Sequence, residues 1–206
     1  MKNAGSALSP RRSPGRPREF NLDEALDRAI NLFSEQGYYG TSISDLSRVM
    51  AVTAGSLYKA FPDKHALFLA ALDRYLQVRG DHLTARLAGL SSGREKIEGI
   101  LRHYAEYSFG ERGERGCLVV ASASELASSH ADIARRIAQL MARYRQRFQL
   151  CIEQGQREGA IPAGIDAQAV AGMLLCITQG MRVLGKTGAS ESEITSLVNI
   201  AMTLVS

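Results

Sequence analysis

Apolar residues recur from Asn21 almost to the C-terminus at the three- and four-residue spacing that places side chains on one face of a helix. In the first segment, 21–37, an Asn that can cap a helix precedes the apolar face, and a Gly that can end a helix follows it. No segment shows the alternation of apolar and polar residues, bounded by turns, that is typical of a strand. The pattern therefore predicts an all-α protein.

Residues that can cap helices divide the rest of the pattern. The Thr-Ser pair at 41–42, with Asp45 at the third helical position, opens a short helix. Thr53 opens a second short helix that ends near residue 61, and Asp63 opens a longer amphipathic one. Further helices are expected at about 91–109, 116–128, 131–154, 167–184 and 191–204, with Asp166 capping the fourth of these and Ser190 the fifth.

The segment 167–184 is apolar on nearly every side, and the final helix also repeats apolar residues. A helix that is apolar all round must be buried on all sides. Two structures would satisfy this requirement: an ordinary core position inside the monomer, or a partner subunit packed against the last two helices. The second favours a homodimer.

The charge of the chain is concentrated at its start. Residues 1–20 hold five basic side chains and one acidic one, which leaves 20 of each in the remaining 186 residues and places the net charge of +4 in this tail. The tail is rich in Pro, Gly and Ser, so we expect it to be disordered in isolation. It is either a solvated terminus or a basic arm that lies along a polyanion.

Composition excludes several classes of protein. The three cysteines, Cys117, Cys151 and Cys176, form neither a disulfide framework nor a metal-type cluster, which favours the reducing cytoplasm. The N-terminus lacks the apolar core of a signal peptide, and we expect no apolar run of the about 18 residues that span a membrane. We find no paired carboxylates, Ser/His/Asp set or phosphate loop, so we expect no enzyme, cofactor or metal.

Two short helices joined by a tight turn and followed by a third helix are typical of a helix-turn-helix unit. The second helix begins with four small residues, 53–56, although glycine near a helix start costs roughly 1 kcal/mol relative to alanine. A slim tip lets the backbone approach the bases of the DNA major groove. Leu57 then faces inward, and Tyr58 and Lys59 follow at positions that reach phosphates.

The stretch LFSEQGYYGTSISDLSRVMAVTAGSLYKAFPDKHALF resembles the N-terminal domain of TetR/AcrR-type transcriptional repressors, and the prefix GRPREF is similar to the start of many members. The resemblance covers about 45 residues densely. It implies a basic arm at 1–20, a DNA-binding domain at 21–79 and an effector-binding, dimerising domain at 80–206. One departure is Ala51, which stands where the family usually has Gly; a left-handed backbone there would cost on the order of 1 kcal/mol.

The resemblance also implies the roles of individual residues on double-stranded DNA. Hydroxyl and backbone donors to phosphate are expected from Thr41 and Ser42. The residues facing base edges are Thr53, Ala54, Gly55 and Ser56. Phosphate contacts are expected from Tyr58, Lys59 and Lys64, and minor-groove contacts from Arg16 and Arg18. The family works as a homodimer on a palindromic operator that a small-molecule effector releases, with the helix after Lys64 as the lever. Whether this chain represses or activates stays open.

The effector is not evident from the sequence. The polar and aromatic candidates for a pocket between helices are Tyr75, His82, His103, Tyr104, Tyr107, Cys117, Met141, Cys176 and Gln179. Cys117 stands at a helix start beside Arg112 and Arg115, an environment that stabilises thiolate. It is either a sensor of electrophiles, oxidants or soft metals, or a small buried hydrophobe. A helical interaction module, or a thiol sensor without sequence-specific DNA binding, is the alternative to a DNA-binding regulator.

Overall fold

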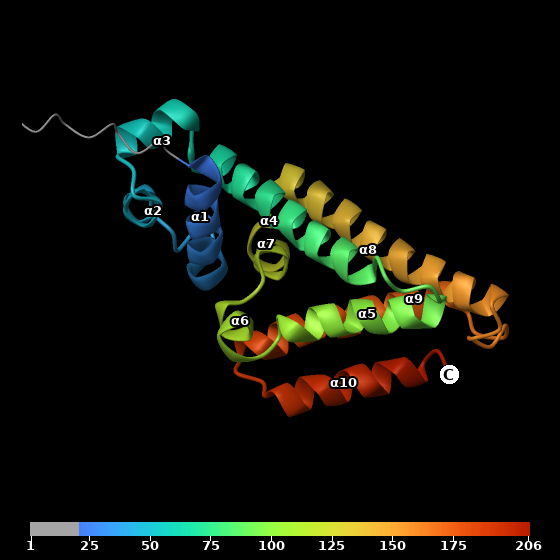
Figure 1. The fold of residues 1–206 in the computed structure, drawn as a ribbon. Coiled ribbons are helices and arrows are strands. Elements are labelled where there is room, and N and C mark those ends of the chain that lie inside the picture. The colour runs from blue at the N-terminus through green and yellow to red at the C-terminus, as the bar shows by residue number, and fades with distance from the viewer. Residues whose placement is uncertain (1–20) are drawn as a thin grey trace, which may run out of the picture.

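The computed structural model describes residues 21–206, and within this range every regular element is a helix (Figure 1). The helices are α1 (Leu22–Gln36), α2 (Ile43–Met50), α3 (Ala54–Ala60), α4 (Lys64–Leu87), α5 (Gly93–Glu106), α6 (Gly110–Arg115), α7 (Leu118–Leu126), α8 (Ala131–Arg157), α9 (Ala167–Lys186) and α10 (Glu191–Thr203). The all-α prediction is confirmed. The tail 1–20, with Arg16 and Arg18, lies outside the described residues, so its disorder and its DNA contacts stay predictions.

Side-chain caps open the helices where the sequence predicts them. The Ser42 hydroxyl accepts the N–H of Asp45 while the Asp45 carboxylate accepts the N–H of Ser42, which is the expected capping box. Ser190 and Glu193 form a second box. The other predicted caps that accept N–H groups of their first turn are Asn21, Thr53, Asp63 and Asp166. Local chemistry therefore sets most helix starts.

The short helix α6 is not among the helices expected from the sequence. The helix expected at 116–128 is present as the shorter α7, which begins after Gly116. The six residues of α6, GERGER, contain no apolar side chain and have no side-chain cap, so no periodicity marks them. Their position depends on a close approach to α9. A Cβ on Gly113 would lie 3.2 Å from the Cα of Gly185. Tertiary packing therefore forms this helix.

Two hydrophobic cores stabilise the chain. The first is built by α1–α4 together with α7 and the first half of α8, and Phe33 and Phe68 are buried in it with ring centroids 5.0 Å apart. The second is built by α5, α9, α10 and the second half of α8 around Phe148. In Figure 1, α4 and α8 both extend from the end that holds α1–α3 toward the end that holds α5, α9 and α10. The first core thus includes residues beyond position 79, and the predicted boundary there stays a prediction.

Helix α9 is long and apolar enough, by length and composition alone, to cross a membrane. The expectation that no apolar run reaches this length was therefore wrong. In the fold, α9 packs against α5, α6, α8 and α10, and Arg182 on it is buried. It also leaves Met173, Val183 and Leu184 about half exposed. The helix belongs to the bundle, with apolar residues that nothing in the range 21–206 covers.

Candidate DNA-binding helix and effector cavity

The turn between α2 and α3 has the compact geometry that the sequence predicts. Ala51 ends α2 in the left-handed conformation, with φ 57° and ψ 41°. The next residue, Val52, donates its N–H to the Ser47 carbonyl over 3.1 Å, and the Ser47 hydroxyl donates to the Val52 carbonyl. The position usually held by glycine in the resembling family therefore does require a positive φ, and this chain places alanine there.

The outer side of α3 is free within the described residues. Leu57 is 3% exposed and packs into the first core, whereas the small residues before it are exposed. A Cβ added to Gly55 would meet only the Thr53 hydroxyl oxygen, 3.9 Å away. Packing inside the chain therefore does not require glycine at this position. The exposed residues of this tip and of the turn after it are Thr53, Ala54, Gly55, Ser56, Tyr58 and Lys59.

One predicted phosphate ligand, Thr41, needs correction, and a second, Lys64, has other contacts but stays a prediction because two carbonyls occupy only two of its three N–H donors. Thr41 is 1% exposed; its hydroxyl donates to the Gly37 carbonyl over 2.7 Å and its N–H to the Tyr38 carbonyl over 3.3 Å, so it has no donor left for a phosphate. The Lys64 ammonium donates to the carbonyls of Tyr38 and Thr41, each over 3.1 Å, and lies 4.3 Å from the centroid of the Tyr38 ring. Both side chains therefore fix the bend before α2. Ser42 is exposed, but its N–H and its hydroxyl both donate to the Asp45 carboxylate, over 3.3 and 2.6 Å.

A cavity of about 340 Å³ lies between α4, α5, α7, α8 and α9. The structure brings six of the nine candidate residues to its wall: Tyr75, His103, Tyr104, Tyr107, Cys117 and Gln179. The other three are elsewhere. Met141 packs against the first core, Cys176 is exposed, and His82 is exposed with its Nδ1 3.1 Å from the Tyr107 hydroxyl. The wall also includes arginines that sequence analysis did not single out.

Two of these arginines, Arg79 and Arg182, give the cavity a cationic side. The Arg79 guanidinium lies 3.3 Å from the centroid of the Tyr107 ring. Arg182 is 3% exposed and donates to the Gly116 carbonyl over 2.8 Å. Burial, together with the charges of Arg79 and Arg86, lowers the pKa of His103 to about 4, which keeps its imidazole neutral at pH 7. A lone arginine in the otherwise apolar α9 was the available sequence clue.

The Cys117 thiol lies at the start of α7 in the cavity wall. The Tyr75 hydroxyl donates to its sulfur over 3.4 Å. Burial opposes ionisation of this thiol, but the charge of Arg182, the Tyr75 hydroxyl and the Val120 N–H outweigh burial and lower its pKa. The predicted environment is therefore present, but the expected cations are not its source. Arg112 lies over the Tyr107 ring, and Arg115 bonds to α1.

Comparison with known proteins decides the family. Residues 25–71 match the family model described as bacterial regulatory proteins, tetR family, and residues 93–199 match the tetracyclin repressor-like C-terminal domain. This chain belongs to the tetR family. The repressor ComR of Escherichia coli K12 is 32% identical over 199 residues, which are 94% of this chain and 93% of ComR. The repressor BdcR of the same organism is 31% identical over 127 residues, 62% of each chain.

The solved structures agree with this family fold. The regulator CifR, crystallised as a cysteine mutant with a 26-base-pair operator, aligns with a TM-score of 0.81 and 29% identity. The alignment covers 91% of this chain and 98% of CifR. A tetR-family regulator from Chloroflexus aurantiacus aligns with a TM-score of 0.79 at 22% identity, which supports the fold alone.

In this tetR-family chain, direct contacts join the helix-turn-helix to the helices of the cavity. The Glu125 carboxylate on α7 accepts the backbone N–H groups of Tyr38 and Tyr39 over 2.8 and 2.7 Å. A Cβ on Gly37 would lie 2.6 Å from this carboxylate, so glycine allows the close approach. Arg74 on α4 pairs with Asp27 on α1 over 2.6 Å. The α1–α2 bend is therefore held by α7, and α1 by α4.

Proposed function

We propose that this chain is a transcriptional repressor that binds a palindromic operator as a homodimer in the cytoplasm and leaves the DNA when a small molecule enters the cavity. Residues 1–20 would act as the basic arm, 21–79 as the DNA-binding domain and 80–206 as the effector-binding and dimerising domain. Repression follows the named activity of ComR and BdcR. The observation that carries the proposal is the exposed slim tip of α3, where glycine serves no packing need inside the chain.

The tip of α3 fits the major groove in size and chemistry. Thr53 and Ser56 offer hydroxyls, and Ala54 or the Thr53 methyl can touch a thymine methyl. Tyr58 and Lys59 are exposed beyond the tip and reach toward phosphates, which set register without reading sequence. Ser42 at the start of α2 is exposed close to its helix N-terminus, and its hydroxyl would exchange the Asp45 carboxylate for a phosphate on DNA.

The apolar residues that α9 and α10 leave exposed support a dimer through these two helices. Met173, Val183 and Leu184 on α9 and Ile200 on α10 are between 45% and 65% exposed. Isolated exposed apolar residues are common on monomers, but a group on two neighbouring helices marks an interface. A dimer would place its two α3 tips on successive major grooves, about 34 Å apart.

The cavity supports release by an effector. Its wall takes residues from α4 and α7, and these two helices hold the α1–α2 bend. A ligand that prefers a different position of α4 or α7 would change the spacing of the two tips and weaken DNA binding. Aromatic rings and cations in the wall favour a planar or anionic molecule, and the lowered pKa of the Cys117 thiol favours an electrophile.

The deciding experiment measures DNA binding by two glycine variants. Gly55→Gln adds a long side chain to the tip, and Gly89→Gln adds the same side chain to another exposed glycine that meets nothing within 4 Å. Fluorescence anisotropy uses labelled DNA from beside the chain's own coding region at several salt concentrations. We expect saturable, sequence-dependent binding that falls steeply with salt for the parent and Gly89→Gln, and at least about a tenfold loss for Gly55→Gln.

Three results would contradict the proposal. A folded, dimeric Gly55→Gln protein that binds as tightly as the parent would show that the tip does not enter the groove. Absence of saturable binding by the parent would favour the helical interaction module instead. If the parent sediments as a monomer, the proposed dimer is wrong, and so is the palindromic operator that a dimer would bind.

A further inference from the structure

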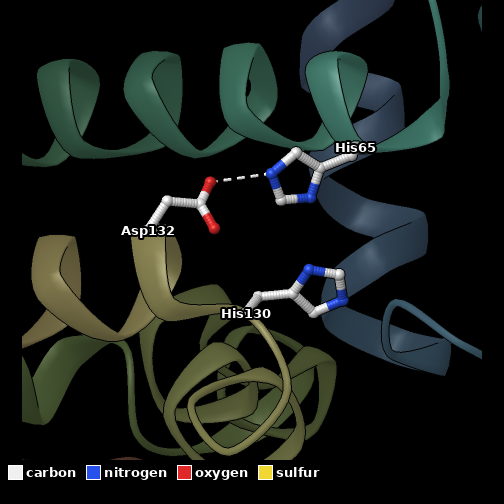
Figure 2. A group of neighbouring side chains, drawn as sticks. All are labelled: His65, His130 and Asp132. Carbon is white, nitrogen blue, oxygen red and sulfur yellow. Dashed lines mark hydrogen bonds and ion pairs between the residues drawn. The ribbon is translucent and has the colours of Figure 1, made fainter.

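Three metal-ligating side chains meet where the DNA-binding domain joins the rest of the chain. His65 lies in the first turn of α4, His130 directly precedes α8, and Asp132 lies in the first turn of α8 (Figure 2). One potential ligand atom from each lies within 4.8 Å of the other two. The two histidines are 65 positions apart, so sequence spacing gives no sign of this group.

The contacts inside the group orient it. The His65 Nε2 and an Asp132 oxygen are 2.7 Å apart, and the two imidazole rings stack with centroids 5.0 Å apart and 19° between their planes. Figure 2 shows the His65 ring above the His130 ring, with the Asp132 carboxylate to one side of His65. Carboxylate–imidazole contacts of this kind recur around protein-bound metal ions.

A second observation points to a ligand. The Nδ1 atom of His65 is buried and has no hydrogen-bond partner among residues 21–206, which is a costly state for a polar atom. If Nε2 carries the proton that it shares with Asp132, Nδ1 has a lone pair without a donor. A metal ion would satisfy this lone pair, and Figure 2 shows this nitrogen on the side of the ring that faces His130.

The surrounding charges allow a cation. Metal ligation requires both imidazoles in their neutral form, in which the group would carry a charge of about −1, and the nearby Lys64 ammonium is bound to the carbonyls of Tyr38 and Thr41. His130 Nε2 also lies 3.3 Å from the Tyr39 hydroxyl, and its ring contacts the uncharged rings of Tyr38 and Tyr39. A divalent ion would therefore meet no competing cation bonded to the group.

We propose that His65, His130 and Asp132 bind a divalent transition-metal ion of the zinc class. Two imidazoles and one carboxylate suit zinc and its neighbours, whereas calcium and magnesium require oxygen ligands. The ligand atoms would close from their present spacing to the about 3.3 Å of a tetrahedral site, leaving the fourth position to water. Both His65 and Asp132 are partly exposed, so their side chains have room to move.

The site goes beyond the proposed function because it does not involve the cavity or the DNA. Its consequence is mechanical: the ion would fasten the start of α8 to the start of α4, where α4 leaves the helix-turn-helix. His130 makes no side-chain capping bond to α8, so its imidazole can turn toward the ion without giving up such a bond.

The test uses the full-length protein after removal of metal with a chelator. Cobalt(II) serves as the spectroscopic probe, and zinc(II) then competes for the same site. We expect one cobalt per chain with the visible absorption of four-coordinate cobalt and no sulfur-to-cobalt charge-transfer band. His130→Ala and Asp132→Asn should each weaken binding at least about tenfold, whereas Asp81→Asn, an exposed acid on α4, should not.

Thermal unfolding keeps the test independent of folding defects. Zinc should raise the melting temperature of the parent and of Cys117→Ser alike, and should leave that of Asp132→Asn unchanged. Equal cobalt binding by the parent and Asp132→Asn would overturn the proposal, and so would a thiolate charge-transfer band that disappears in Cys117→Ser. Because none of these measurements uses DNA, their outcome is separate from that of the proposed function.

Discussion

Tyr39 donates its backbone N–H to the Glu125 carboxylate over 2.7 Å, across 86 positions of the chain. The second oxygen of the same carboxylate accepts the N–H of Tyr38 over 2.8 Å. Glu125 lies near the end of α7, and α7 begins directly after Cys117 in the cavity wall. One short helix therefore connects the cavity to the bend that precedes α2. Sequence analysis assigns the lever to α4 alone, and the structure provides a second route.

Removing the Glu125 carboxylate should destabilise the fold. Glu125→Ala leaves two backbone N–H groups of the bend without an acceptor, and hydrogen bonds to a charged group contribute about 1.5–3 kcal/mol each when well formed. Because Glu125 is partly exposed, water will replace part of this loss. We expect the free energy of unfolding to fall by about 2 kcal/mol, measured by urea denaturation.

Glu114→Ala is the matched control for this change, since Glu114 is an exposed acid on α6. It should change the free energy of unfolding by less than about 0.5 kcal/mol. Equal stability of the two variants would mean that the contact of Glu125 with the bend contributes nothing, and the second route between cavity and DNA-binding domain would lose its support.

Ala51→Gly should stabilise the protein. Ala51 is the one residue other than glycine with a positive φ in the part of the chain that the structure describes. An L-residue in this conformation costs roughly 1–2 kcal/mol of stability, and glycine avoids most of this cost. Part of the gain is lost because the unfolded chain with glycine has more conformational entropy to give up on folding. We expect a gain of about 1 kcal/mol in the free energy of unfolding, measured by urea denaturation.

The control for Ala51→Gly is Ala60→Gly, because Ala60 is exposed and helical in α3. This second change should lower the free energy of unfolding by about 0.5–1 kcal/mol, through helix propensity and backbone entropy. A loss of stability in both variants would contradict the strain assigned to the turn.

The helices and their starts could be predicted because caps and apolar spacing are local properties of the sequence. Ser42 with Asp45, and Ser190 with Glu193, form their boxes within four residues. The misjudged features depend on how the folded chain packs around them. Thr41 has a hydroxyl that looks free until Gly37 and the first core bury it. Helix α6 exists only because α9 lies against it.

The chemistry of the cavity could be predicted only in part for the same reason. Residue type places Cys117 among the reactive candidates, but its strongest cation comes from Arg182, 65 positions later. The neighbours in sequence, Arg112 and Arg115, point to other partners. Sequence distance is a poor guide to charge in a helical bundle, because the wall of one cavity draws residues from five helices.

The stability of the protein should fall as the pH drops from about 6.5 to 4, partly through His103. Burial holds its pKa at about 4 in the fold, whereas the unfolded chain has the ordinary value near 6.5. The unfolded state therefore binds more protons in this window, which removes up to about 3 kcal/mol of stability by pH 4. His103→Phe, which keeps an aromatic ring, should flatten the curve of unfolding free energy against pH between these values. A slope equal to that of the parent would contradict the neutral His103.

Cys117 should react with electrophiles faster than the exposed Cys176 does. We expect N-ethylmaleimide to form a thioether at Cys117 near pH 7, with the thiolate sulfur adding to the alkene carbon, and to release the protein from DNA. Mass spectrometry locates the adduct, and anisotropy follows the release. Cys176→Ser should be released like the parent, and Cys117→Ser should stay bound, because Cys176 has no part in the cavity.

The source of this reactivity can be assigned with two further variants. Arg182→Met removes the buried cation and Tyr75→Phe removes the hydroxyl that donates to the sulfur, so both should raise the pKa of Cys117. Below that pKa, each unit of rise slows the reaction about tenfold, because it removes nine-tenths of the thiolate. Arg112→Met should leave the rate unchanged, since Arg112 lies over the Tyr107 ring. If Cys117 reacts slowly in Arg112→Met but quickly in Arg182→Met and Tyr75→Phe, the activating charge comes from the sequence neighbours of Cys117. The reverse pattern would assign the activating charge to α9 and the activating hydroxyl to α4, so that the Cys117 thiol would be activated by two of the helices that line the cavity.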